Sequence, residues 1–352
     1  MALCLLAVAL LWFFGRKLNW TEVRTAVSHA NPTFLVAAVF IIFLSYVIRA
    51  LRWGAFLKPL VSVGFRNLFA ATTIGFGAMF LIGRTGEVVR PVVLPMRDPR
   101  VRPSASFVTI MVERIYDIVA VVLMFSVNLA WFKPTTNLGN EFERVRIVGF
   151  VLLFCTVAGL VVLTWFRKKS PLVIGFFSRL FDRWRFIPKR LSKLVVGLLE
   201  QLALALRVLV NARELAETIG WTFLLWAAIT LANMLVIRAF GIRFGLSETI
   251  FVLGWALVGS LVPTPGGAAG AFHAATAAGL LFLGIDKELA AAVSILMHAV
   301  DFGLALFFGL AYAIKGDLNF SRLRALTSSE AVEHVVEEED LLPDPVANGS
   351  RP

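Results

Sequence analysis

The sequence is poor in charge and in cysteine, and each shortage excludes a class of protein. Only 16% of the 352 residues are charged and 59% are hydrophobic, whereas soluble domains carry about 25% charged and about 45–50% apolar residues. Too few charges remain to cover the surface of a soluble fold of this size. The two cysteines, Cys4 and Cys155, lie in apolar stretches, so the chain has no disulfide framework. HExxH, CxxC, Walker and GxSxG motifs are also missing, and we expect no metal site and no cofactor.

Long apolar blocks separated by basic segments are what the chain does have. Blocks of about 17–25 residues match a helix that crosses a bilayer core of roughly 30 Å. The sequence therefore predicts an all-α, polytopic integral membrane helix bundle. The net charge of +11 lies mainly in short loops, which indicates membrane orientation and anionic lipid contact rather than nucleic-acid binding. The blocks are residues 2–14, 33–48, 67–82, 105–132, 147–166, 218–238, 249–262, 267–284 and 289–314.

The distribution of arginine and lysine suggests how the blocks cross the membrane. If every block crossed once, the basic segments 83–104 and 167–193 would face outside, against the positive-inside rule. The rule holds if 67–96 and 249–284 are re-entrant hairpins, because Pro and Gly interrupt both. This arrangement predicts about six full spans, two re-entrant broken-helix hairpins and both termini in the cytoplasm. The basic loop 49–66 then also faces the cytoplasm.

Two segments have a different character from the membrane blocks. Residues 171–215 alternate apolar and basic side chains at helical spacing, which indicates amphipathic helices on the inner leaflet or, as an alternative, a helix packed against the bundle. Residues 327–352 are acidic and contain Pro and Gly, which is typical of a disordered tail.

The first candidate site is the segment GRTGEVVRP, which contains Arg84, Glu87 and Arg90. At i, i+3 spacing these side chains would share one helical face, and a backbone interrupted by glycine offers free N–H groups to an anion. One interpretation is a phosphate head-group site in which Glu87 positions the arginines. The other is an ordinary cytoplasmic loop.

A second cluster, Glu113, Arg114 and Asp117, begins a long apolar helix. Glu113 and Asp117 share a face at i, i+4, and two buried carboxylates need a cation, which Arg84 or Arg90 could supply. The alternatives are charges that cap the span or a purely structural ion network.

The third candidate is PTPGGAAGAFHAA, which breaks the helical pattern inside an apolar region. Irregular backbone at membrane depth is tolerated only where protein buries it or where it lines a cavity. A half-helix that begins here would favour negative charge at its N-terminus, although a tight structural turn is the alternative. The residues of this candidate are Pro263, Pro265, Gly266, Gly267, Gly270 and His273.

His298 and Asp301 lie three residues apart in the last apolar block. An aspartate that fixes a histidine tautomer is a candidate proton relay, and helix packing is the alternative interpretation.

The segments GRTGEVVRPVVL, VERIYDIVAVV and LVPTPGGAAGAFHAA, in this order, resemble the signature segments of the lysylphosphatidylglycerol synthase transmembrane family, also called flippase-like or UPF0104 proteins. The resemblance covers about residues 1–320. It implies a membrane domain that moves a lipid between leaflets, with the three candidate segments above as its functional core. Many relatives carry Glu after the glycine-rich motif where this chain has His273. The synthases add a soluble transferase domain, for which the chain after residue 320 is too short, so we expect no lysyltransferase activity and no enzyme.

Three functions follow as hypotheses. The first is a flippase for an anionic, possibly aminoacylated, phospholipid or lipid-linked molecule in a bacterial inner membrane. The second is a permease for a small polar solute, coupled to protons through His273, His298 and Asp301. The third is a non-catalytic subunit that partners a separate transferase, and the chain could also form a homo-oligomer. A lateral opening to lipid would favour the first hypothesis over the second.

Overall fold

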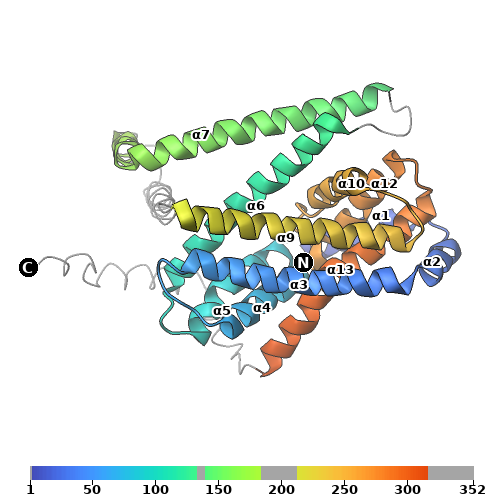
Figure 1. The fold of residues 1–352 in the computed structure, drawn as a ribbon, viewed down its shortest axis with the longest axis horizontal. Helices are drawn as coiled ribbons and strands as arrows, with labels where there is room; N and C mark the ends of the chain where they lie inside the picture. The colour runs from blue at the N-terminus through green and yellow to red at the C-terminus, as the bar shows by residue number, and fades with distance from the viewer. Residues whose placement is uncertain (1, 133–138, 184–211, 316–352) are drawn as a thin grey trace, which may run out of the picture.

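The computed structural model describes residues 2–132, 139–183 and 212–315, and this part of the chain is helical without strands. Figure 1 shows a bundle from which one long helix, α7, stands apart at the top, connected through α6. The elements are α1 (Ala2–Gly15), α2 (Trp20–His29), α3 (Pro32–Leu57), α4 (Phe65–Ile82), the 3₁₀ helix η1 (Gly83–Val88), α5 (Val89–Arg97), α6 (Pro103–Trp131), α7 (Gly139–Arg183), α9 (Ala212–Ala239), α10 (Leu246–Gly259), α11 (Pro265–Ala268), α12 (Ala271–Phe282) and α13 (Lys287–Lys315).

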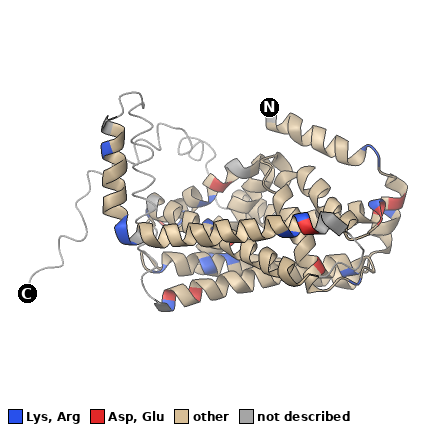
Figure 2. Cartoon of the chain, turned by 90° about the horizontal axis from the view of Figure 1, so that it is seen from above, with Lys and Arg blue, Asp and Glu red and all other residues tan. Residues whose placement is uncertain are grey.

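Five helices of the described chain are long and apolar enough to cross a membrane. They are α3, α4, α9, α13 and residues 143–166 of α7, and the pair α1 and α2, bent by 86°, would make a sixth. The predicted all-α polytopic membrane fold is thereby confirmed. Figure 2 shows long stretches of helix that carry neither acidic nor basic side chains, as hydrocarbon contact requires.

Both interrupted regions form helical hairpins. The first consists of α4, η1 and α5, and its turn begins at Gly83, where φ is +73°. The second pairs α10 of 14 residues with α12 of 12 residues, which at 1.5 Å per residue are about 21 and 18 Å long. These lengths fall short of the roughly 30 Å hydrocarbon core. Among the helices of the two hairpins, α4 has the length of a span. The re-entrant arrangement, and the membrane face from which each hairpin enters, therefore stay predictions.

The predicted loop at 49–66 is wrong in its first half, because α3 continues through Leu57. Arg49 and Arg52 therefore lie inside a helix whose neighbouring side chains Trp53 and Phe56 are buried. Likewise, much of the predicted loop 83–104 is helical in η1 and α5. The hydropathy of a segment falls at each arginine, whether or not an acidic partner neutralises that arginine in the fold. A helix that contains buried ion pairs therefore resembles a loop in its sequence.

α7 continues beyond its apolar block and bends at Lys169, whose φ of −122° and ψ of 19° are not helical. Pro171 follows two residues later, and proline removes a backbone hydrogen bond at such a bend. Helix resumes through Arg183, and the amphipathic interfacial helices expected over 171–215 stay a prediction. Residues 184–211 and the predicted tail 327–352 lie outside the described residues.

Candidate functional site

Glu113 of α6 lies between two arginines in the interior of the bundle. Its Oε1 atom is 2.9 Å from Arg52 Nη2 of α3 and accepts a hydrogen bond of 2.8 Å from Arg90 Nη1 of α5. Its Oε2 atom accepts a second bond from Arg90 at 3.0 Å. The side chains of all three residues are at most 3% exposed. One carboxylate thus connects α3, α5 and α6 at a depth where an unpaired charge would be strongly unfavourable.

Asp117 lies one helical turn after Glu113 and completes the network. Arg52 donates two hydrogen bonds to its carboxylate, at 2.6 and 3.1 Å, and the indole N–H of Trp226 in α9 donates to Asp117 Oδ1 at 3.3 Å. Arg52 Nη1 also donates to the hydroxyl of Thr222 at 3.4 Å. The i, i+4 spacing therefore places both carboxylates on one face, where two guanidinium groups balance them. Four helices meet at this network.

Arg90 owes its position to close packing between α4 and α5. Its guanidinium lies 4.1 Å from the ring centroid of Trp53, a distance at which cation–π attraction acts. The Trp53 indole is fixed by a hydrogen bond of 3.1 Å to Thr109. A Cβ atom at Gly75 would lie 2.6 Å from Arg90 Cβ, so only glycine lets α5 approach α4 this closely.

Arg114 and Glu87 form a looser, partly exposed rim of the network. Arg114 Nε lies 4.0 Å from Glu87 Oε2, and Arg114 Nη1 lies 3.7 Å from Asp117 Oδ2. Glu87 was expected to hold Arg84 and Arg90, but its ion pair in the described chain is with Arg114. Arg90 instead pairs with Glu113, because α5 begins at Val89 and directs it toward α6. The side chain of Arg84 lies outside the described residues.

Sequence reasoning missed Arg52 and Arg49. Arg49 lies with its guanidinium 4.7 Å from the ring centroid of Phe76 and 5.9 Å from that of Tyr46. Among the described residues, no carboxylate lies within 4.0 Å of it. The signal that could have found both arginines is their i, i+3 spacing in VIRALRW, directly after an apolar block. This spacing places two cations on one helical face.

The second hairpin turns in left-handed backbone and meets the first. Gly266, Gly267 and Gly270 have φ values of 76°, 63° and 85°, which glycine tolerates and other residues rarely adopt. A Cβ atom at Gly83 would lie 3.2 Å from the carbonyl oxygens of both Pro263 and Thr264. The two interrupted segments, far apart in sequence, therefore touch at this point, as expected for broken helices that form one site.

Two histidines form hydrogen bonds with the backbone of that turn. His298 of α13 is hydrogen-bonded through Nε2 to the Gly267 carbonyl at 3.1 Å, and His273 accepts at Nδ1 from the Gly270 N–H at 3.2 Å. Their ring centroids are 4.6 Å apart. The carboxylate of Asp301 instead accepts from Asn233 of α9 at 3.3 Å. The structure thus brings His298 together with His273, and the predicted relay from His298 to Asp301 stays a prediction.

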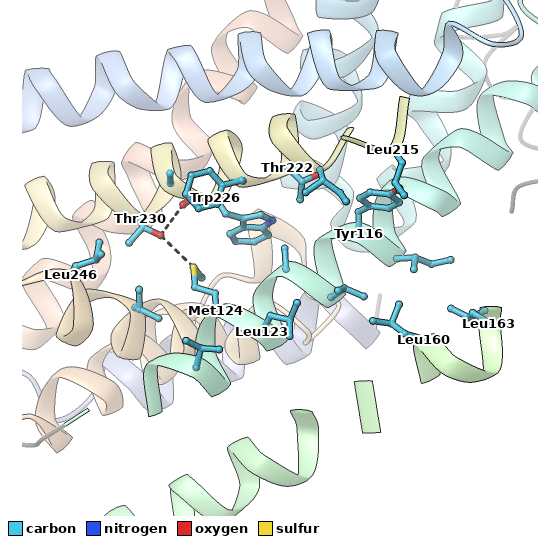
Figure 3. A pocket seen from close by; sticks show the side chains of 18 of the residues that line it. Tyr116, Leu123, Met124, Leu160, Leu163, Leu215, Thr222, Trp226, Thr230 and Leu246 are labelled. Atoms are coloured by element: carbon cyan, nitrogen blue, oxygen red, sulfur yellow. Dashed lines mark hydrogen bonds between the residues drawn. The ribbon is translucent and has the colours of Figure 1, made fainter. Parts of the chain in front are cut away.

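An apolar groove of about 910 Å³ runs between α6, α7 and α9 and reaches the start of α10. Figure 3 shows Trp226 and Thr230 of α9 on the side of Met124 of α6, and Thr222 next to Tyr116. Thr222 and Trp226 line this groove and also bond to Arg52 and Asp117. The groove and the ion network therefore share one wall.

Comparison with known proteins agrees with the motif resemblance. The chain is 23% identical over 319 residues to a UPF0104 membrane protein of Pyrococcus horikoshii, covering 86% of this chain and 92% of that protein. It is 23% identical over 298 residues to a UPF0104 membrane protein of Methanothermobacter thermautotrophicus, covering 82% and 87%. The glycosyltransferase AglD of Haloferax volcanii is 22% identical over 363 residues, covering 94% of this chain and 55% of AglD. The family model described as "Lysylphosphatidylglycerol synthase TM region" matches residues 1–309, and the chain belongs to this family of integral membrane proteins.

Proposed function

We propose that this protein moves an anionic lipid, or a lipid-linked molecule, between the two leaflets of a membrane. The observation that carries the proposal is the buried network of Arg52, Arg90, Glu113 and Asp117 among helices built to cross a bilayer. A charge at the centre of a membrane helix costs roughly 2.5–3.5 kcal/mol on insertion scales. In membrane proteins such residues mark substrate and ion pathways, proton relays, voltage sensors or ligand counter-ions.

The geometry of the network indicates where an anionic head group would bind. Arg52 and Arg90 are engaged by carboxylates at 2.6–3.1 Å and are almost fully buried. Arg114 is 32% exposed, and its carboxylates lie at 3.7 and 4.0 Å. An arriving phosphate can replace these long contacts far more easily than the inner ones. Arg114 therefore binds the head group in this proposal, and the inner arginines and carboxylates hold α6 in place around it.

Two further findings support a lipid over a small polar solute. The ion network borders an apolar groove rather than a polar vestibule, as a ligand with a charged head and a hydrocarbon tail requires. Family membership, through a domain named for a phospholipid-modifying synthase, supports a role in lipid or glycolipid metabolism. The proposal assigns no catalysis to this chain, although one relative is named a glycosyltransferase.

We further propose that the protein lies in a bacterial inner membrane with both termini in the cytoplasm. There it contacts anionic phospholipid and partners a separate transferase or a second copy of the chain.

The test is transfer of a fluorescent phosphatidylglycerol in proteoliposomes, followed by dithionite quenching of the outer leaflet. Arg114→Ala is compared with Arg146→Ala, a matched control because Arg146 also pairs with an acidic residue at i, i+3, is 40% exposed and lies in α7 away from the network. We expect Arg114→Ala to abolish protein-dependent transfer and Arg146→Ala to retain it, with both variants folded. Full transfer by folded Arg114→Ala protein would contradict the proposed site.

A further inference from the structure

The polar groups that line the groove are already satisfied by the protein. The hydroxyls of Thr164, Thr222 and Thr230 each donate to the carbonyl four residues earlier in their own helix, at 2.6, 2.8 and 2.8 Å. The indole N–H of Trp226 is used by Asp117. These four donors therefore point back into the protein, and among the described lining residues the Tyr116 hydroxyl, 3.4 Å from Thr218 Oγ1, is the other polar group. What these walls offer to a ligand is apolar contact.

Helices long and apolar enough to cross a membrane, α7 and α9, form two walls of the groove. Phe223 and Leu123 on its lining are 75% and 38% exposed, so part of the groove is open at the surface of these helices. A protein partner gains little from hydrophobic association inside lipid, where helix contacts depend on small residues and interhelical hydrogen bonds. Leu, Ile, Val, Phe and Met side chains dominate this lining instead. Its composition fits a flexible hydrocarbon chain.

The groove passes beside the proposed head-group site. Ile115 and Tyr116, the residues directly after Arg114, line the groove. Thr222 and Trp226, one turn apart on α9, line it from the opposite helix and contact the ion network. A chain lying along α9 therefore passes Thr222 and Trp226 and lies beside the ion network that includes Arg114.

We propose that the groove between α6, α7 and α9 binds the hydrocarbon chain of a membrane lipid, with Thr222 and Trp226 forming the part of its wall that contacts the ion network. This inference rests on the proposed function, which places the anionic head group at Arg114. It adds a binding site for the hydrocarbon tail of the same lipid. In the transfer cycle, the lipid would leave the bulk bilayer and bind the protein at this groove. Its volume of about 910 Å³ lies within the range of about 300–1,000 Å³ that is usual for ligand sites.

The test uses the full chain in vesicles that contain phosphatidylglycerol with a diazirine in one acyl chain. After illumination, mass spectrometry compares labelling of groove residues Leu123 and Phe223 with labelling of Ile314, which is 80% exposed on α13 and lies outside the groove. Ala227→Trp fills the groove. Leu224→Trp is the matched control, since Leu224 is 47% exposed on the same helix and is not part of the lining.

We expect stronger labelling in the groove than at Ile314, and we expect Ala227→Trp to reduce groove labelling to the Ile314 level while Leu224→Trp preserves it. Equal labelling of the three positions, or no effect of Ala227→Trp, would overturn the tail site. Absence of lipid label from the groove would also overturn it and indicate another occupant, such as residues 184–211 or a second copy.

Transfer assays on the same samples separate the two proposals. If the groove is not labelled but transfer still requires Arg114, the tail site is wrong and the proposed function stands. If the groove is labelled but the wild-type protein does not transfer lipid, the proposed function is wrong and the tail site stands.

Discussion

Arg52 and Asp117 are 65 residues apart in sequence, and their side chains meet through two hydrogen bonds of 2.6 and 3.1 Å. This two-pronged contact between a guanidinium and a carboxylate is both strong and directional. The same guanidinium lies 2.9 Å from Glu113, so Arg52 neutralises two acidic side chains of α6 at once. α3 and α6 are therefore fixed in register by charge as well as by packing.

Arg52→Gln should be the most destabilising single change in the network. The variant leaves Asp117 without its main cation and Glu113 with Arg90 alone, and removing one partner of a buried ion pair typically costs about 3–5 kcal/mol. We expect a large fall in the midpoint of thermal unfolding in detergent. Arg100→Gln is the control, because Arg100 lies at the surface, where its hydrogen bond lowers the pKa of Asp98. Equal unfolding midpoints for wild type and Arg52→Gln would show that α3 and α6 do not depend on this contact.

Arg90→Lys should weaken the network although it keeps the charge. Lysine cannot reproduce the paired hydrogen bonds to Glu113 at 2.8 and 3.0 Å or the flat contact with Trp53, since its ammonium is a compact, strongly hydrated point charge. We expect a loss of unfolding free energy of about 1–3 kcal/mol from the poorly satisfied carboxylate. Titration with SDS against a folded reference measures it, and wild-type stability in Arg90→Lys would mean that charge alone is required.

The sequence predicted the helical membrane class well, because an apolar block of span length is typical of a helix that crosses the bilayer. It also predicted that Glu113 and Asp117 share a face and need a cation, which Arg84 or Arg90 could supply, and Arg90 lies against Glu113. Helical spacing is local information, and these residues lie within a few turns of each other or on a neighbouring hairpin. The two glycine-rich interruptions were likewise visible in sequence, because backbone chemistry depends on the residue itself.

Arg52 and the groove could not be found in the same way. Arg52 follows an apolar block, where a basic residue usually marks the end of a span. Its burial depends on acidic partners 61 and 65 residues away, and no local pattern encodes such a pairing. The groove is formed by α6, α7 and α9 together, and each wall by itself resembles an ordinary lipid-facing helix.

Gly75→Ala should separate α4 from α5. A Cβ atom at this position would lie 2.6 Å from Arg90 Cβ and 3.2 Å from the Arg90 Cα atom, and the backbone cannot move aside as a flexible side chain can. Overpacking of this kind typically costs about 1–3 kcal/mol. Gly159→Ala is the matched control, since nothing lies within 4 Å of a Cβ atom there in α7. We expect a lower unfolding midpoint and reduced transfer only for Gly75→Ala, and unchanged values in both variants would show that the hairpin is loosely packed.

His298→Phe should loosen the turn at the second hairpin. Phenylalanine fits among the rings of Phe80, Phe272 and Phe302 that surround this position, but it cannot donate to the buried carbonyl of Gly267. An unsatisfied buried acceptor costs about 1–3 kcal/mol, so we expect a lower unfolding midpoint than for His29→Phe, a change at an exposed histidine of α2.

The same His298→Phe variant, compared with Asp301→Asn, tests the proton relay. The carboxylate of Asp301 accepts from Asn233, and the Tyr46 hydroxyl bonds to the backbone carbonyl of Asp301, which the substitution retains. If His298 and Asp301 pass a proton between them, both variants should alter the pH profile of lipid transfer in the same way, because either change interrupts the path. An altered profile in His298→Phe alone would assign the proton step to the His273–His298 pair, whose rings are 4.6 Å apart, and would contradict the relay through Asp301.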